Sequence, residues 1–259
     1  MCTLTIVRTS EATGGGGPRP VGIRMACNRD EARTRPPALP PEVRDFGPCR
    51  AILPIDPVGG GTWIAINDSG LAASLLNHYS AKRRGERTAS ALEATASRGT
   101  IIPRLMHCAT MDEALAALEG IDVSAYPPFR LILTDGRDLV EATGDARRLA
   151  SIRRTLGDAP VMFASSGLGD DVVDGPRRAL FHQILTPGPD LADRQDAYHR
   201  HSWPDRRQLS VCMSRADART VSYTVVQREP DRIWLTYYGD APDRPVTPVR
   251  VELASKAAR

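Results

Sequence analysis

The sequence predicts an α+β domain in which antiparallel sheets are covered by helices. Strand-like segments open the chain, helical segments fill its middle, and strands end it. Short turns join neighbouring strands where a parallel sheet would need helical crossovers, so the sheets are expected to be antiparallel. Of the 259 residues, 41% are hydrophobic and 25% are charged, a composition that can supply a sizeable core without disulfides or metals.

The first two elements form a predicted hairpin. Residues 3–9 (TLTIVRT) and 21–31 (VGIRMACNRDE) are strand-like, and the glycine- and proline-rich residues 10–20 join them. The proline-rich residues 34–48 predict a surface connection with local polyproline conformation.

A second hairpin is predicted by the apolar residues 62–67 (TWIAIN) and 71–77 (LAASLLN), which are separated by the turn sequence Asp-Ser-Gly. The glycines at 59–61 are not a phosphate loop, because no Gly-Lys-Ser/Thr follows them and the next element is a strand.

Helical spacing dominates the middle of the chain. Residues 86–99, 101–109 and 111–120 are predicted to be helical, and the last of these has acids in its first turn, where the helix dipole favours them. Pro103 lies near the start of its segment, where a helix tolerates proline.

The second half begins with a third hairpin at residues 129–144, which has an Asp-Gly turn. Residues 161–185 predict a strand, a loop and a helix with Pro176 in its first turn, and residues 190–203 predict a shorter helix. Three strands are expected to close the chain, at residues 208–215, 220–229 and 232–239.

Composition excludes several classes of function. The net charge is only +3, and the densest basic cluster, residues 82–87, is short and has no interleaved aromatics, so no nucleic-acid partner is expected. No apolar run approaches the roughly 20 residues that span a bilayer, and the N-terminus has no secretory pattern. The five cysteines are scattered and odd in number, which predicts reduced thiols and a cytoplasmic location.

No metal or other cofactor is expected. The cysteines form no CxxC pair, and His199 and His201 have no evident third ligand. The partner we expect is therefore a small molecule, and the oligomeric state stays open.

Cys2 is the first candidate for chemistry. Removal of Met1 would leave a thiol and a free α-amine on the same residue. An α-amine has a pKa of about 7.7, so at neutral pH it can take a proton from the thiol or from water, as in terminal-nucleophile hydrolases. The apolar strand after Cys2 would hold the nucleophile rigidly. The alternative is a buried cysteine at the start of an ordinary strand.

A polar cluster, Asn28, Arg29, Asp30 and Glu31, ends the second predicted strand. Four such residues in a row cannot all face a core. Either they form an exposed strand end with ion pairs, or some of them converge on the N-terminus when the first two strands pair.

These motifs together resemble the NRDE family of Transport and Golgi organization protein 2-like proteins. The resemblance spans the whole chain, 1–259, which is therefore expected to be a single domain. It is carried by MCT at the start, NRDE at 28–31, GGTW at 60–63, GLAASLLN at 70–77 and SSGLGDDVVDGPR at 165–177.

The resemblance implies a relationship to N-terminal nucleophile cysteine hydrolases, which cleave non-peptide amide bonds. Their fold is a four-layer αββα sandwich of two antiparallel sheets between helices. It also implies that Cys2 is the nucleophile. The second function it suggests is a non-catalytic binding or trafficking protein for a small hydrophobic ligand such as haem or acyl-coenzyme A.

The Arg-Asn-x-Asp motif of those hydrolases aligns with Cys27 to Asp30. The alignment matches Asn28 and Asp30, whereas the arginine position falls on Cys27. Arg29 lies two residues away and keeps the same strand face, so it is the expected substitute, with Arg24 a weaker candidate.

Asn77 matches an asparagine that donates to the oxyanion in those enzymes, although a strand-end turn cap is the alternative role. We also expect Asn28, Trp63, His78, Ser165 and Ser166 to bind the substrate. A second active-site arginine would correspond to Arg215 or Arg219.

Overall fold

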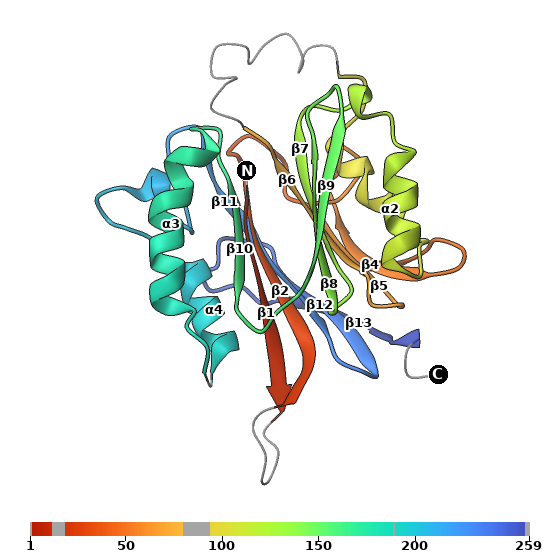
Figure 1. The fold of residues 1–259 in the computed structure, drawn as a ribbon. Coiled ribbons are helices and arrows are strands. Elements are labelled where there is room, and N and C mark those ends of the chain that lie inside the picture. Colours follow the sequence, from red (N-terminus) through yellow and green to blue (C-terminus); the bar gives the residue numbers. More distant parts are fainter. Residues whose placement is uncertain (1, 12–18, 80–93, 189, 257–259) are drawn as a thin grey trace.

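The computed structural model describes residues 2–11, 19–79, 94–188 and 190–256. Two antiparallel sheets face each other, as Figure 1 shows. The first sheet has the strand order β10-β1-β2-β11-β12-β13. Its strands are β1 (Cys2–Glu11), β2 (Arg19–Ala32), β10 (Val161–Ser165), β11 (Ala218–Arg228), β12 (Arg232–Tyr238) and β13 (Val249–Ala254).

The second sheet runs in chain order from β3 to β9, and every pair is antiparallel. Its strands are β3 (Leu39–Asp45), β4 (Arg50–Ile55), β5 (Ile64–Asn67), β6 (Ala72–Asn77), β7 (Phe129–Thr134), β8 (Asp138–Gly144) and β9 (Leu149–Thr155).

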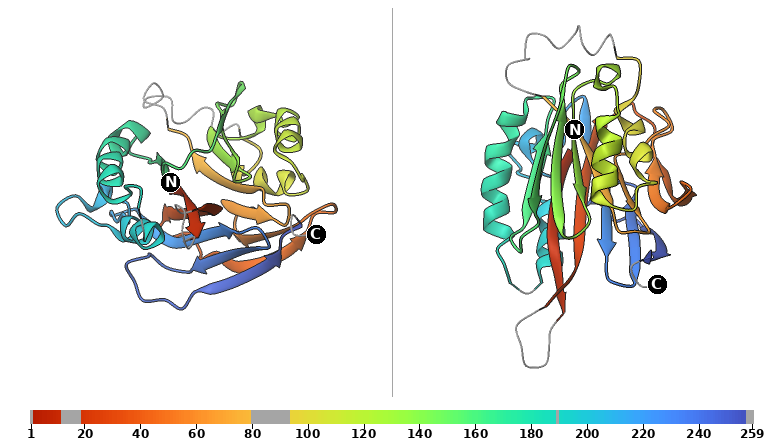
Figure 2. Two further views of the ribbon diagram at one scale, coloured as in Figure 1. Left: turned by 60° about the horizontal axis from the view of Figure 1, so that its bottom comes forward. Right: turned by 45° about the vertical axis from the view of Figure 1, so that its right-hand side comes forward.

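Helices cover the outer face of each sheet. On the first sheet lie α3 (Asp170–Ile184) and α4 (Leu191–Arg200), and on the second lies α2 (Met111–Glu119) (Figures 1 and 2). Short 3-10 turns complete the described elements: η2 (Arg98–Thr100), η3 (Ile102–Leu105), η4 (Val123–Ala125) and η5 (Arg207–Leu209). The four-layer αββα sandwich predicted from the sequence is therefore confirmed.

Alternation of side chains builds the layers. On β1, Leu4 and Ile6 point into the core between the sheets, where they meet Ile64 and Ile66 of β5. Thr3 points toward the helices, where the buried Arg177 of α3 donates to its hydroxyl at 2.7 Å. Strand β1 therefore has one face in an apolar core and one face against helices.

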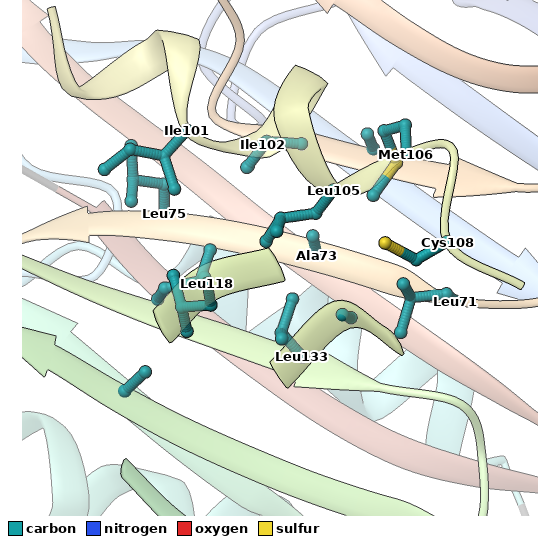
Figure 3. Packing of buried hydrophobic residues seen from close by; sticks show 14 of the residues in the cluster. Leu71, Ala73, Leu75, Ile101, Ile102, Leu105, Met106, Cys108, Leu118 and Leu133 are labelled. Carbon is teal, nitrogen blue, oxygen red and sulfur yellow. The ribbon is translucent and has the colours of Figure 1, made fainter. Parts of the chain in front are cut away.

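A separate apolar layer joins the second sheet to its helices. Leu105 and Leu118 from the helical segment pack with Leu71 and Leu133 of the sheet (Figure 3). Burying one leucine side chain fully contributes about 1.5–3 kcal/mol, so this layer fixes the helical segment on the sheet.

The three predicted hairpins are confirmed: β1–β2, β5–β6 and β7–β8. The prediction for residues 34–48 was wrong, because β3 forms there. Its two prolines are tolerated because β3 is the edge of its sheet, where a missing N–H costs no ladder bond. Strands β4, β9 and β13 were not predicted either, and the last two are also edges.

The expected strand at 208–215 was also wrong. Its backbone carbonyls accept hydrogen bonds from side chains: Asn28 donates to Val211 at 2.9 Å, and Arg177 donates to Leu209 at 3.0 Å. These bonds hold the segment on the helix side of the first sheet, away from its edge.

Two helix predictions need correction. Pro176 is an interior residue of α3, which starts earlier than expected because Asp170 accepts from the Ser166 N–H at 2.9 Å and two acids favour the first turn. Residues 101–109 contain only a short 3-10 turn. The helix predicted at 86–99 falls mainly on residues 86–93, which lie outside the described part of the chain; η2 occupies its end.

Candidate active site

The pairing of β1 with β2 brings the predicted nucleophile to the polar cluster. Cys2 lies directly opposite Arg29, and Leu4 lies opposite Cys27. Side chains alternate along a strand, so Cys2, Cys27 and Arg29 share the face toward the second sheet. Asn28 lies on the other face, toward the helices.

Cys2 opens into a pocket of about 210 Å³ between the two sheets. The predicted residues that line it are Arg29, Asp30, Trp63 and Asn77. The remaining walls come from Glu31, Arg35, Asp56, Gly61, Thr62, Leu75, Ser97, Arg98 and Gly99, most of which are polar or charged.

The Cys2 thiol is tuned by a second thiol. A hydrogen bond from Cys27 lowers the pKa of Cys2, burial and the charge of Asp30 oppose this, and the positive charges of the chain terminus and Arg29 lower the pKa further. The pKa of Cys27 is raised well above its usual value by the same contact and by burial. Negative charge in this pair therefore resides on Cys2.

Arg29 is held in place by three neighbours. It donates to Asp56 at 2.8 Å, lies 3.6 Å from Glu31, and its guanidinium stacks 4.4 Å from the centre of the Trp63 ring. A planar guanidinium suits both the carboxylate and the aromatic face. Its charge therefore stays close to the Cys2 sulfur.

Asp30 is buried on the opposite face of β2. Thr220 donates a 2.7 Å hydrogen bond to its Oδ1. Burial raises the pKa of Asp30, whereas Arg177 and the positive chain terminus act to lower it. A carboxylate that interacts with the terminal charge is suited to orient an amine at this end of the chain.

Ser165 of β10 lies opposite Cys2 on the other side of β1. Its hydroxyl accepts a hydrogen bond from the Cys2 backbone nitrogen at 3.1 Å. Ser165 thus contacts the nitrogen that would become the α-amine, and it does not line the pocket. Ser166 is likewise absent from the lining, since its hydroxyl accepts from the Leu168 N–H at 3.2 Å.

Asn77 ends β6 at the pocket and donates from Nδ2 to the Tyr79 hydroxyl at 2.8 Å. An amide nitrogen carries two hydrogens, so one remains for an oxyanion. His78 points elsewhere: its Nδ1 lies 3.6 Å from Asp170, and it is not among the pocket residues.

Other candidates lie away from Cys2. Asn28 donates to the carbonyls of His199 and Val211, both at 2.9 Å, and is fully buried. Arg24 is bound to Gln195 and Asp196, both at 2.6 Å, on the helix side.

Arg215 and Arg219 form ion pairs with Asp217 and Asp240, at 2.7 and 2.5 Å. Arg215 also acts on the site as a minor influence that lowers the pKa of Asp30.

Sequence reasoning missed Cys27, Tyr79 and Arg98 as parts of the site. The alignment that placed Cys27 where a hydrolase has arginine was the one available signal for it. Arg98 was assigned to a helix, and its place in the pocket depends on packing between distant segments.

Within the described ranges, no three His, Cys, Asp or Glu side chains gather in a way that could hold a metal ion. The helices described here are all too short or too polar to cross a membrane.

Known proteins have a similar architecture. Among solved structures, the chain is similar to the Caenorhabditis elegans ortholog of N-acylethanolamine-hydrolyzing acid amidase, with 15% identity and a TM-score of 0.52 over 93% of this chain and 94% of that chain. It is also similar to a mutant conjugated bile acid hydrolase from Clostridium perfringens, with 10% identity and a TM-score of 0.45 over 97% and 96%. No curated protein matches the sequence significantly.

The likeness to the amidase ortholog shows a shared fold, a sandwich of two antiparallel sheets between helices. At the level of sequence, the family model described as Transport and Golgi organisation 2 matches residues 1–168, which include Cys2, the NRDE motif and Asn77. The chain therefore belongs to the Transport and Golgi organisation 2 family, also called the NRDE family.

Proposed function

We propose that the protein is an amidohydrolase that uses Cys2 as an N-terminal nucleophile on a non-peptide amide of a small molecule. The observation that carries this proposal is the position of Cys2: its thiol has a lowered pKa and opens into a polar pocket that also contains Arg29, Asp30 and Asn77. The fold shared with an amide hydrolase supports it.

The proposed reaction begins after removal of Met1. The Cys2 sulfur attacks the amide carbonyl carbon, and its α-amine takes the thiol proton. The amine then gives this proton to the leaving nitrogen as the carbon–nitrogen bond breaks, which leaves a thioester. Water, deprotonated by the same amine, attacks the thioester, and release of the carboxylic acid restores the thiol.

Three residues have proposed catalytic roles. Arg29 stabilises the thiolate across the β1–β2 ladder. Asp30 orients the α-amine, with Ser165 as a hydrogen-bond partner of the same nitrogen. Asn77 stabilises the oxyanion with its Nδ2 group, together with a backbone N–H. Trp63 supports Arg29 and forms a wall for the substrate.

A binding function without chemistry is the second candidate, with haem or acyl-coenzyme A as the ligand. The observation that favours it is Cys27, which stands where the hydrolase motif has arginine. Hemin titration and acyl-thioester competition test it, since a ligand bound to the native state must raise the melting temperature.

The five cysteines are free in the structure, which fits a cytoplasmic location.

The deciding experiment combines intact mass with activity. We expect native protein without Met1 to hydrolyse members of a panel of N-acyl amides, and the Cys2→Ala variant to lose this activity. Cys49→Ala, which removes another buried thiol, is the matched control and should retain it. Hydrolysis that persists in Cys2→Ala, or an active protein that keeps Met1, would contradict the proposal.

A further inference from the structure

Arg98 is an arginine of the pocket whose guanidinium is anchored at one nitrogen and can bind an anion with the other two. Arg98 belongs to η2 and lines the same pocket as Cys2. Its Nε donates to the backbone carbonyls of Pro127 and Pro128, at 3.2 and 2.9 Å. Those bonds occupy one nitrogen of the guanidinium and leave the two Nη groups without a bond to any described residue.

The other two arginines of the pocket are already paired. Arg29 and Arg35 share Asp56, at 2.8 and 2.6 Å, and both lie 3.6 Å from Glu31. Within the described ranges, Arg98 has no carboxylate at ion-pair distance, and Glu31 acts on it only as a more distant charge. Arg98 is therefore the cation of this pocket whose charge is least compensated.

Because Arg98 is partly buried, its uncompensated positive charge costs free energy. Desolvation lowers the pKa of Arg98 from its usual value, and the nearby Tyr79 and Glu31 only partly offset this. A half-buried guanidinium without an anionic partner is destabilising, so a ligand that supplies an anion would bind favourably.

The position of Arg98 is fixed by tight backbone packing. The Thr62 N–H donates to the Gly99 carbonyl at 3.0 Å, and a Cβ on Gly61 would lie 2.3 Å from Gly99. The Ser97 hydroxyl accepts from the Gly99 N–H at 3.4 Å. This packing makes Arg98 a preorganised part of the wall, which lowers the entropic cost of binding.

Arg29 is an arginine whose charge lowers the pKa of Cys2. Arg98 lines the same pocket, and its unbonded Nη groups suit it to bind a part of the substrate other than the reacting carbonyl. The volume of about 210 Å³ is below the range of about 300–1000 Å³ typical of drug-sized ligands, which favours a small substrate.

We propose that the substrate is a small amide carrying an anionic group, a carboxylate or a phosphate, that binds the Nη groups of Arg98. This inference rests on the proposed amidohydrolase function and makes Arg98 a specificity-determining residue for it. A guanidinium fork matches both anions with two parallel hydrogen bonds.

Three probes with one acyl group test the inference on the full chain: N-butyrylglycine, N-butyryl-O-phosphoethanolamine and the neutral N-butyrylethanolamine. We expect kcat/KM for an anionic probe to exceed that for the neutral probe by roughly 10- to 100-fold, the usual effect of a charge-assisted hydrogen bond. The better of the two anionic probes identifies the anion as carboxylate or phosphate. Equal use of all three probes would overturn the inference and leave the amidohydrolase proposal intact.

Substitutions at Arg98 test whether this residue causes the preference for anionic probes. Arg98→Gln should abolish the preference mainly through KM, and Arg98→Lys, which keeps the charge, should retain part of it. Arg104→Gln is the matched control, because it removes an exposed arginine of the neighbouring η3 that does not line the pocket. Melting temperatures verify folding, and a preference unchanged in a folded Arg98→Gln variant would contradict the assignment.

Binding measurements distinguish failure of this inference from failure of the proposed amidohydrolase function. If none of the probes is hydrolysed, calorimetry with the Cys2→Ala variant measures their affinities directly. Tighter binding of an anionic probe that Arg98→Gln weakens would support the inference without any catalysis. Equal or undetectable binding of the three probes would overturn it.

Discussion

Arg29 lies directly opposite Cys2 across the β1–β2 ladder, with its guanidinium stacked over Trp63 at 4.4 Å. The related hydrolase motif would place its arginine at Cys27, two residues earlier and on the same face of the strand. The shift puts a thiol diagonally next to Cys2 and the positive charge directly across from it. Both neighbours lower the pKa of Cys2.

Alkylation should single out Cys2. The pKa of Cys2 is lowered from 9.0 to about 7, so the rate of labelling by iodoacetamide should rise with pH and reach half of its maximum near pH 7. Cys212 is an internal control, because burial raises its pKa to about 12. Peptide mapping over a pH series measures both rates. A midpoint near pH 9 for Cys2 would contradict the prediction.

Cys27→Ala should make Cys2 less reactive. The substitution removes the hydrogen bond that contributes most to the lowered pKa, so the midpoint of alkylation should move toward 9. If the whole shift is lost, labelling at pH 7 slows by up to roughly 50-fold. Cys49→Ala removes a thiol of similar burial next to Ser69 and should leave the midpoint unchanged. Equal midpoints in both variants would argue against a role for Cys27.

Asn77→Ala should reduce kcat about 100-fold with little change in KM, since removal of one oxyanion donor typically has an effect of this size. Tyr79→Phe removes the hydroxyl that accepts from Asn77 Nδ2 but leaves the amide in place, so its effect should be several-fold smaller. Steady-state kinetics on any amide that the protein hydrolyses measures both. An unchanged kcat in Asn77→Ala would restrict Asn77 to capping its strand.

Gly61→Ala should damage the pocket. The added Cβ would lie 2.3 Å from the Gly99 backbone, which cannot move without displacing η2, so we expect a loss of roughly 1–3 kcal/mol in unfolding free energy. Gly157→Ala is the control, because its Cβ would meet nothing within 4 Å and its φ is not positive. There alanine should be neutral or stabilising. Urea denaturation of both variants tests the contrast, which equal stabilities would refute.

His199 should make stability depend on pH. It is fully buried, with Nδ1 3.1 Å from Asn28 Oδ1 and Nε2 2.7 Å from the Thr5 hydroxyl. Burial, together with the charges of Arg24 and Arg177, lowers its pKa well below 6.5. Between that lowered value and 6.5 the unfolded chain binds a proton that the native state does not.

Unfolding free energy should therefore decrease as the pH falls below about 6.5, by up to about 1.4 kcal/mol per pH unit from this residue. Urea denaturation at pH 7.5 and 5.5 measures the loss. His199→Gln should flatten the dependence, while the exposed His107→Gln should leave it intact. The same slope in all three proteins would show that His199 is not its source.

Local sequence patterns were sufficient to predict the three hairpins and the helices α2 and α4. The Asp-Ser-Gly and Asp-Gly turns lie between apolar runs, and each hairpin closes through contacts that are near in sequence. The edge strands β3 and β9 were missed because β3 contains prolines and β9 is almost wholly exposed, so neither shows the usual alternation. The segment at 208–215 has strand-like residues, yet side chains of Asn28 and Arg177 satisfy its carbonyls.

By itself, the sequence determined antiparallel sheets with helices outside, and the family resemblance that it carries implied the four-layer sandwich. The predicted hairpin of the first two strands brings Cys2 to the NRDE motif, because strand alternation and a short-range connection fix which residues face each other. Only the tertiary structure decided which of the polar residues share the pocket. Asn28 lies on the helix side of β2 and outside the pocket, whereas Asp30 lines it. Arg98 joins the pocket wall through backbone packing between two loops that are distant in sequence. Such contacts depend on how the two sheets pack, and no local periodicity encodes that packing.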